Sequence, residues 1–133
     1  MPRGAMITKP ISSSPTISKF SADEIVTRLT DRVLDQIRIT VPWRPGAREL
    51  LAELKTAGIP TALVTMSVTR MAEYVVSAIE FDAFDAVVAG DMVTHSKPHP
   101  EPYLRAAEML GVDIERCVAI EDSVTGLASA VAS

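Results

Sequence analysis

Three short, mostly apolar runs separated by helical patterns restrict this chain to an α/β fold. The runs are Thr61–Val64, Phe84–Ala89 and Val118–Ile120, and residues with helical spacing of apolar positions follow each of them. Runs of this kind are typical of strands that are buried on both faces. Strands that alternate with helices favour a parallel sheet with right-handed crossovers. We therefore expect an α/β fold with a parallel sheet and helices on both faces.

Local signals mark where the helices begin and end. Ser21 and Glu24 form a capping box ahead of an apolar stripe, which predicts an amphipathic helix over Ala22–Arg38. Glycines Gly58 and Gly111 fit the position just past a helix C-terminus. The further predicted helices run from Pro45, placed at the first helical position, to Ala57, from Thr69 to Ile79, from Glu101 to Leu110, and onward from Ser123.

Composition bounds the class of protein. The 133 residues suffice for one domain or part of a larger one, and the net charge of −4 argues against a general nucleic-acid partner. No apolar stretch approaches the length of a membrane span, so we expect no membrane partner. The single cysteine, Cys117, suits a reducing compartment and is expected to be buried and inert. These features predict a cytoplasmic location.

A hydroxyl residue, Thr65, stands at the end of the first apolar run. Ligands of open α/β sheets bind just beyond the carboxyl ends of the strands. The Thr65 hydroxyl and the free backbone N–H groups that follow, beginning at Met66, are therefore candidates for holding a phosphate oxygen. The alternative is that Thr65 or Ser67 caps the next helix, which is the commoner use of such residues.

Lys97 lies in a turn that two prolines make stiff. Pro98 excludes helical backbone at Lys97, and a compact ammonium held in this way can neutralise a phosphoryl oxygen or a carboxylate. The alternative is a solvated surface lysine. His95 and His99 flank Lys97 on this proline-interrupted turn rather than on a helix, so we interpret both as loop residues and do not predict a zinc site.

Two adjacent acids, Glu121 and Asp122, directly follow the third apolar run. Carboxylates at the end of a buried strand are costly unless something compensates their charge. Mg²⁺ takes one or two protein carboxylates together with water and phosphate oxygens, so the pair predicts an Mg²⁺ site. The alternative is that Asp122 only caps the last helix.

This ordered set of motifs resembles the haloacid dehalogenase-like (HAD) superfamily, in its phosphatase and phosphomutase branch with a small helical cap. The matching positions are Arg44–Gly46, Thr65, Lys97–Tyr103 and Glu121–Gly126. The resemblance implies that Thr65 binds the transferring phosphoryl group. It also implies that Lys97 stabilises the nucleophile and the charge on phosphorus, and that Glu121 and Asp122 hold Mg²⁺. The implied reaction is hydrolysis of a small phosphorylated metabolite through an aspartyl-phosphate.

The family's Asp-x-Asp nucleophile motif, which ends its first strand, has no counterpart in this sequence. We therefore expect a partial family member. It has a flexible segment over residues 1–20, a remnant cap helix over 21–40 and an incomplete HAD-like core over 41–133. The first hypothesis is a phosphatase whose nucleophile belongs to a missing segment. The second is a non-catalytic module that binds metal or phosphate weakly or pairs with another chain. A dehalogenase or phosphomutase shares the same core, but the acidic pair favours phosphoryl chemistry.

Overall fold

The computed structural model describes residues 19–133, so most of the segment predicted to be flexible, residues 1–20, lies outside the described part. The helices are α1 (Ala22–Ile39), α2 (Ala47–Thr56), α3 (Thr69–Ser77), α4 (Glu101–Leu110) and α5 (Val124–Val131). The strands are β1 (Ala62–Val64) and β2 (Ala86–Val88), and two short 3-10 helices, η1 (Gly90–Met92) and η2 (Ile114–Arg116), complete the order. None of the described helices is both long and apolar enough to cross a membrane.

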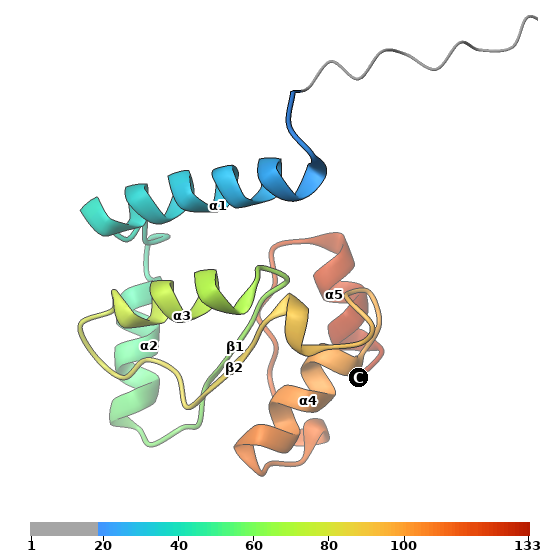
Figure 1. The fold of residues 1–133 in the computed structure, drawn as a ribbon. Coiled ribbons are helices and arrows are strands. Elements are labelled where there is room, and N and C mark those ends of the chain that lie inside the picture. Colours follow the sequence, from blue (N-terminus) through green and yellow to red (C-terminus); the bar gives the residue numbers. More distant parts are fainter. Residues whose placement is uncertain (1–18) are drawn as a thin grey trace, which may run out of the picture.

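The two strands pair in parallel, with Leu63 of β1 opposite Val87 of β2. Helix α4 packs against both strands and α3 packs against β2. These two helices lie on opposite sides of the strand pair (Figure 1). The predicted α/β class, with a parallel sheet between helices, is thereby confirmed.

Small side chains dominate the centre of the molecule. The buried apolar residues include Ala83, Ala86, Val88, Ala89, Ala106 and Ala107. Alanines on α4 and on β2 allow the helix to approach the sheet closely, because no long side chain holds the two elements apart. Lys97 lies in the turn that leads into α4.

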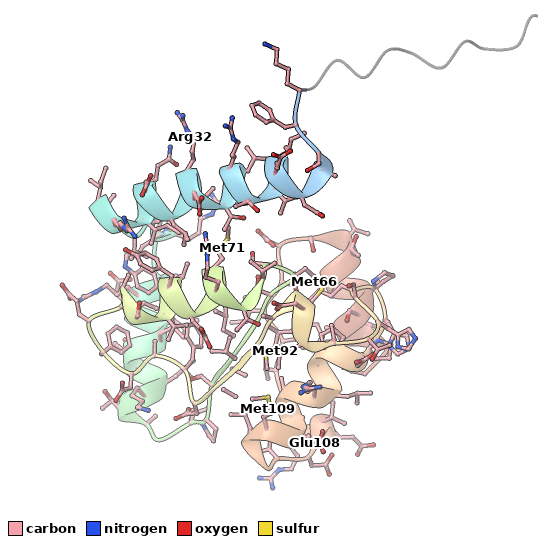
Figure 2. The ribbon with its side chains drawn as sticks, viewed as in Figure 1. Arg32, Met66, Met71, Met92, Glu108 and Met109 are labelled. Carbon is pink, nitrogen blue, oxygen red and sulfur yellow. The ribbon has the colours of Figure 1, made fainter. Side chains whose placement is uncertain are left out.

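Helix α1 begins as the capping box predicts. The Glu24 N–H donates to Ser21 Oγ at 3.2 Å, and the Ser21 N–H donates to the Glu24 carboxylate at 2.8 Å. The helix packs on α3, and Met71 lies between the two helices (Figure 2). Much of its predicted apolar face is nevertheless open, since Leu29 is 61% exposed.

The start of α2 differs from the prediction. Its first helical residue is Ala47 rather than Pro45, and Gly46 is the N-cap with φ of +80°. Glycine adopts this left-handed conformation without the penalty that a Cβ brings, so the chain turns at Gly46 before the helix begins. The glycines expected past α2 and α4 do have positive φ, +68° at Gly58 and +67° at Gly111.

The predicted third strand, Val118–Ile120, is wrong. These residues form no strand, and Val118 and Ile120 are 90% and 77% exposed. A strand exists only through hydrogen bonds to a neighbour, and β1 pairs only with β2 among residues 19–133. Cys117 at the start of the run is exposed instead of buried for the same reason.

Candidate functional site

Lys97 joins three parts of the chain at the carboxyl end of β1. Its ammonium donates to the Val64 carbonyl at 3.1 Å and to the Tyr103 hydroxyl at 3.3 Å, and it forms a short ion pair with the Glu121 carboxylate. The Lys97 and Glu121 side chains are each only 9% exposed. The alternative of a solvated surface lysine is therefore wrong, and the structure brings Lys97 and Glu121 together beside Thr65.

Tyr103 is a member of this cluster that sequence reasoning did not single out. Its hydroxyl donates to the same Glu121 oxygen that Lys97 contacts. Burial, together with the neighbouring carboxylate, raises the pKa of the Tyr103 phenol, so the hydroxyl stays protonated and remains a donor. No spacing rule links the tyrosine to the acid, because the two residues lie on different elements and meet only in the fold.

Burial opposes ionisation of Glu121, but the hydrogen bonds from Lys97 and Tyr103 outweigh it and lower the pKa of the carboxyl. The glutamate is therefore an anion at neutral pH. Its charge, which the sequence predicted a metal would compensate, is already balanced by Lys97. The second carboxylate oxygen accepts only from the Ser123 hydroxyl, at 3.3 Å, among the described residues.

Asp122 differs from its neighbour. It is exposed and has no hydrogen bond or ion pair with any residue in the described part of the chain. The alternative that it caps the last helix is wrong, since Ser123 is the N-cap of α5 and its hydroxyl accepts from the Gly126 N–H at 3.0 Å. The Asp122 carboxylate is thus available to a ligand.

Thr65 and Met66 form a tight turn at the end of β1. The Ser67 N–H donates to Thr65 Oγ1 at 3.1 Å, which leaves the Thr65 hydroxyl hydrogen free to donate. The Met66 N–H has no acceptor among residues 19–133. Neither Thr65 nor Ser67 caps α3, whose N-cap is Val68. The capping alternative for Thr65 is therefore wrong.

Gly90, which lies two residues after β2, packs against this turn. Its N–H donates to the Ser67 carbonyl at 2.8 Å, and a Cβ built on it would lie 2.5 Å from the Met66 carbonyl oxygen. Only a residue without a side chain allows two backbone segments to approach so closely. Figure 2 shows Met66 next to the start of η1. The position of Met66 thus depends on Gly90.

Asp91 caps α3 from a different element, which the sequence patterns did not predict. Its Oδ1 accepts from the Thr69 backbone N–H at 2.8 Å and from the Thr69 hydroxyl at 2.6 Å. These hydrogen bonds lower the pKa of the Asp91 carboxyl. Helix α3, which follows the Thr65 turn, is thereby hydrogen-bonded to Asp91, the residue after Gly90.

Replacing Asp91 with alanine is expected to lower the midpoint of thermal unfolding by roughly 4 °C, because α3 loses its cap. The unfolded chain binds this proton at a higher pH than the folded chain, so the cap stabilises above about pH 4 and its contribution is lost in acid. Circular dichroism melts at pH 7 and pH 3 measure both effects. Asp82→Ala is the matched control, since Asp82 is exposed without a partner in the described range, and an equal shift in both variants would contradict the assignment.

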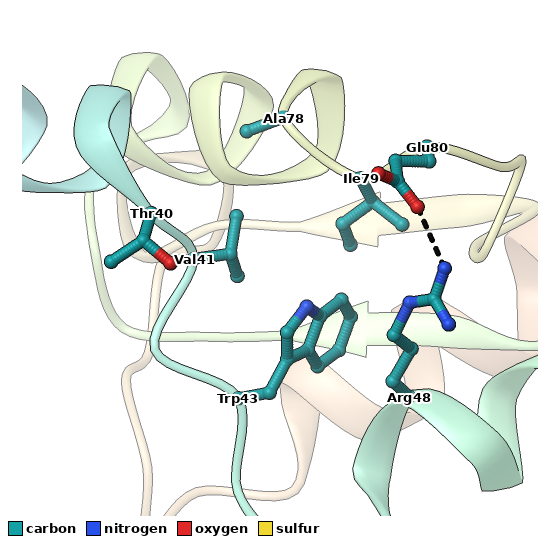
Figure 3. Close-up of a pocket in the computed structure, with 7 residues that line it drawn as sticks. All are labelled: Thr40, Val41, Trp43, Arg48, Ala78, Ile79 and Glu80. Carbon is teal, nitrogen blue, oxygen red and sulfur yellow. Dashed lines mark hydrogen bonds and ion pairs between the residues drawn. The ribbon is translucent and has the colours of Figure 1, made fainter.

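A shallow pocket lies away from this cluster, between the α1–α2 linker and the end of α3. Its lining residues are Thr40, Val41, Trp43, Arg48, Ala78, Ile79 and Glu80. The Trp43 indole and the Arg48–Glu80 ion pair, which is 2.6 Å long, flank the space (Figure 3). Trp43 therefore lies beside the residues that follow α3, and none of the predicted site residues lines this pocket.

The profile of the family described as haloacid dehalogenase-like hydrolase matches residues 15–133. The chain belongs to this family. The HAD-like assignment made from the ordered motifs is thereby confirmed.

Individual relatives agree with the family. Hexitol phosphatase B of Escherichia coli (strain K12) is 39% identical over 114 residues, covering 85% of this chain and 51% of that protein. CbbY from Rhodobacter sphaeroides in complex with phosphate has a TM-score of 0.77 at 34% identity, covering 86% of this chain and 53% of that one. A CbbY mutant in complex with xylulose-(1,5)bisphosphate has a TM-score of 0.74 at 33% identity. This HAD-like chain spans about half the length of these relatives.

Proposed function

We propose that this chain supplies the phosphate- and Mg²⁺-binding part of a cytoplasmic HAD-type phosphatase that acts on a small phosphorylated metabolite. Hydrolysis proceeds through an aspartyl-phosphate, and the nucleophile comes from an Asp-x-Asp strand that this sequence does not contain. Phosphorylated sugars are the favoured substrate class, because one relative is named as a hexitol phosphatase and another binds xylulose-(1,5)bisphosphate.

One observation supports the proposal most strongly, namely the position of Lys97. The ammonium connects Val64, the last residue of β1, with Glu121, which begins the acidic pair. Thr65 therefore lies one residue from the backbone atom that Lys97 contacts. This contact supports a shared site for a hydroxyl, an ammonium and two carboxylates from three separate segments at the strand ends, where α/β sheets bind their ligands.

The roles of the residues follow from their contacts. The Thr65 hydroxyl and the Met66 N–H donate to two oxygens of the phosphoryl group, since both hydrogens are free in the described part of the chain. Lys97 places positive charge beside the same oxygens and beside an incoming carboxylate. Fixed donors of this kind stabilise charge that develops on phosphorus, because they need no reorganisation during the reaction.

The acidic pair fits a hard divalent cation. Asp122 offers an exposed carboxylate without a partner among residues 19–133, and Glu121 offers its Oε2, because Lys97 and Tyr103 contact only Oε1. Mg²⁺ prefers such oxygen ligands. When bound, the ion neutralises the negative charge of the substrate phosphate.

The missing nucleophile strand has a place beside β1. The carbonyl of Thr61 and the N–H of Thr65 pair with the β2 side, so the intervening residues Ala62 and Val64 present their backbone groups to the other edge. On that edge only Lys97 contacts a backbone atom, the Val64 carbonyl, among residues 19–133. A strand that paired there would end next to Thr65 and Lys97, where an aspartate could attack the phosphoryl group.

Asp122→Asn in the protein purified from its own source is expected to reduce release of phosphate from a hexitol phosphate by about 100-fold. The variant also needs a higher Mg²⁺ concentration for half-maximal rate, because it loses one anionic ligand. A colorimetric phosphate assay over an Mg²⁺ series measures both quantities. Asp122 has no hydrogen bond or ion pair with a described residue, so we expect the substitution to leave the fold unchanged.

Asp82→Asn is the control, since it removes the same charge from another exposed aspartate without a partner in the described range. It should leave both the rate and the Mg²⁺ dependence unchanged. An Asp122→Asn variant with wild-type rate and Mg²⁺ requirement would rule out the acidic pair as the metal site.

A second candidate function rests on the exposed apolar residues Val118 and Ile120 together with the open edge of β1. A non-catalytic module could pair with another chain at this edge, because an unpaired strand edge is a template for a further strand. Phosphatase activity of the protein purified from its own source separates the two candidates. A non-catalytic module would release no phosphate at any Mg²⁺ concentration.

A further inference from the structure

The two histidines of the chain, His95 and His99, meet Glu101 at the start of α4. One potential ligand atom from each of the three lies within 4.8 Å of the others, and the two imidazole rings stack with centroids 4.5 Å apart. Both histidines are loop residues, as predicted, but the turn does not keep them apart. The chain reverses direction in this turn and so brings the two rings together. Rules for residue spacing on a helix do not predict this contact.

Glu101 is fixed in a geometry that prepares His95 as a ligand. Its carboxylate accepts from the backbone N–H groups of Thr94, at 2.7 Å, and His95, at 2.8 Å. The His95 Nδ1 lies 2.8 Å from the same carboxylate, so it carries the proton and leaves a lone pair on Nε2. Metal-binding histidines are typically oriented by such a carboxylate.

His99 is held in place as well. Its carbonyl accepts from the Ser129 hydroxyl at 2.6 Å, and Ser129 is fully buried on α5. Its Nδ1 accepts from the Glu101 N–H at 3.1 Å, so Nδ1 is the unprotonated ring nitrogen, and a metal ion bound there would replace the Glu101 N–H as its partner. The turn is therefore anchored at His99, while the His95 side chain is 61% exposed and is held by Glu101.

We propose that His95, His99 and Glu101 bind a borderline divalent metal ion such as Zn²⁺, at a site separate from the acidic pair. Two imidazole nitrogens and one carboxylate are ligands that Zn²⁺ accepts, and water completes its tetrahedron. Tetrahedral bonds of about 2.1 Å require ligand atoms roughly 3.4 Å apart, so the ligand atoms, now within 4.8 Å of one another, must move closer when the ion binds. Mg²⁺ favours oxygen ligands, so we expect Mg²⁺ at the acidic pair and Zn²⁺ at the histidine site. The inference does not depend on the proposed phosphatase activity.

Isothermal titration of Zn²⁺ into the untagged protein, in buffer that contains Mg²⁺, tests the site. We expect one Zn²⁺ per chain, and we expect His95→Gln and His99→Gln each to weaken binding by about 100-fold. Titration of Co²⁺ gives a second readout, because tetrahedral Co²⁺ absorbs visible light strongly and each histidine variant should lose that band. All titrations use the Cys117→Ser background, since the exposed Cys117 thiol is itself a zinc ligand.

Glu101→Gln and Glu108→Gln form the matched pair of carboxylate variants. Glutamine at residue 101 keeps an oxygen for the Thr94 N–H but removes the charge, so Zn²⁺ binding should weaken. Glu108 is exposed at the far end of α4 (Figure 2), and its replacement should leave binding unchanged. Zn²⁺ affinity equal to wild type in both histidine variants would overturn the proposal, as would affinity lost in Asp122→Asn but kept in His95→Gln.

Discussion

Replacing Lys97 with methionine is expected to lower the free energy of unfolding by about 3–5 kcal/mol. The substitution removes one partner of an ion pair whose two side chains are each 9% exposed, and leaves the Glu121 carboxylate buried without its counter-charge. It also leaves the Val64 carbonyl without the hydrogen bond that Lys97 donates. Urea denaturation followed by the fluorescence of Trp43, the one tryptophan of the sequence, measures the loss.

Lys55→Met is the matched control for Lys97→Met. Lys55 forms an ion pair with Asp85 at 3.1 Å, but its side chain is 43% exposed, so water compensates the lost charge. We expect a small effect at Lys55. The double variant Lys97→Met with Glu121→Met should recover much of the lost stability, because no unpaired charge remains. Equal destabilisation by Lys97→Met and Lys55→Met would contradict the buried-pair account.

Gly90→Ala is expected to destabilise the fold by about 1–3 kcal/mol. The added Cβ would lie 2.5 Å from the Met66 carbonyl oxygen and 2.9 Å from its carbon, and both atoms belong to the backbone. Because the backbone cannot turn aside as a side chain does, the Thr65–Ser67 turn must shift. The same urea titration measures the loss. If the proposed function holds, phosphate affinity falls with it, because the Met66 N–H moves.

Gly126→Ala provides the contrast. Its Cβ would lie 2.1 Å from Glu121 Oε2, which is the end of a side chain and not backbone. Moving the carboxylate disturbs its buried pair with Lys97, so Gly126→Ala is also expected to destabilise the fold, although alanine is favoured over glycine in a helix by about 1 kcal/mol. Stability equal to wild type in Gly126→Ala would contradict the position of the Glu121 carboxylate.

The parts of the fold that depend on local chemistry could be predicted from the sequence. The capping box of Ser21 and Glu24 and the glycines past α2 and α4 fix helix ends through hydrogen bonds and φ angles within a few residues. The ends of α1, α3 and α4 accordingly lie within two residues of their predicted positions. Pro45 was placed wrongly because a proline signal marks the region of a helix start and not its first residue.

Features that depend on a distant neighbour could not be predicted in the same way. The run Val118–Ile120 has strand composition, yet it forms no strand without a partner to complete its hydrogen bonds. Its apolar side chains stay exposed, and the expectation that Cys117 is buried fails with it.

The candidate site shows the same division. The sequence indicated Lys97 and Glu121 as members, and the structure brings them into contact. The phenol of Tyr103 and the cap that Asp91 provides to α3 were not predicted, since each is a side chain from one element that meets another only after folding. Spacing rules describe neighbours along one helix or strand and carry no information about contacts between different elements.

The intact mass of the protein purified from its own source shows whether a nucleophile accompanies these residues. If Thr65, Lys97, Glu121 and Asp122 form one part of a phosphatase site, the nucleophile belongs to a further strand. We expect a mass well above 14.3 kDa, with an Asp-x-Asp motif in the additional residues. A mass equal to that of this chain, together with Mg²⁺-dependent release of phosphate that Asp122→Ala abolishes, would contradict it.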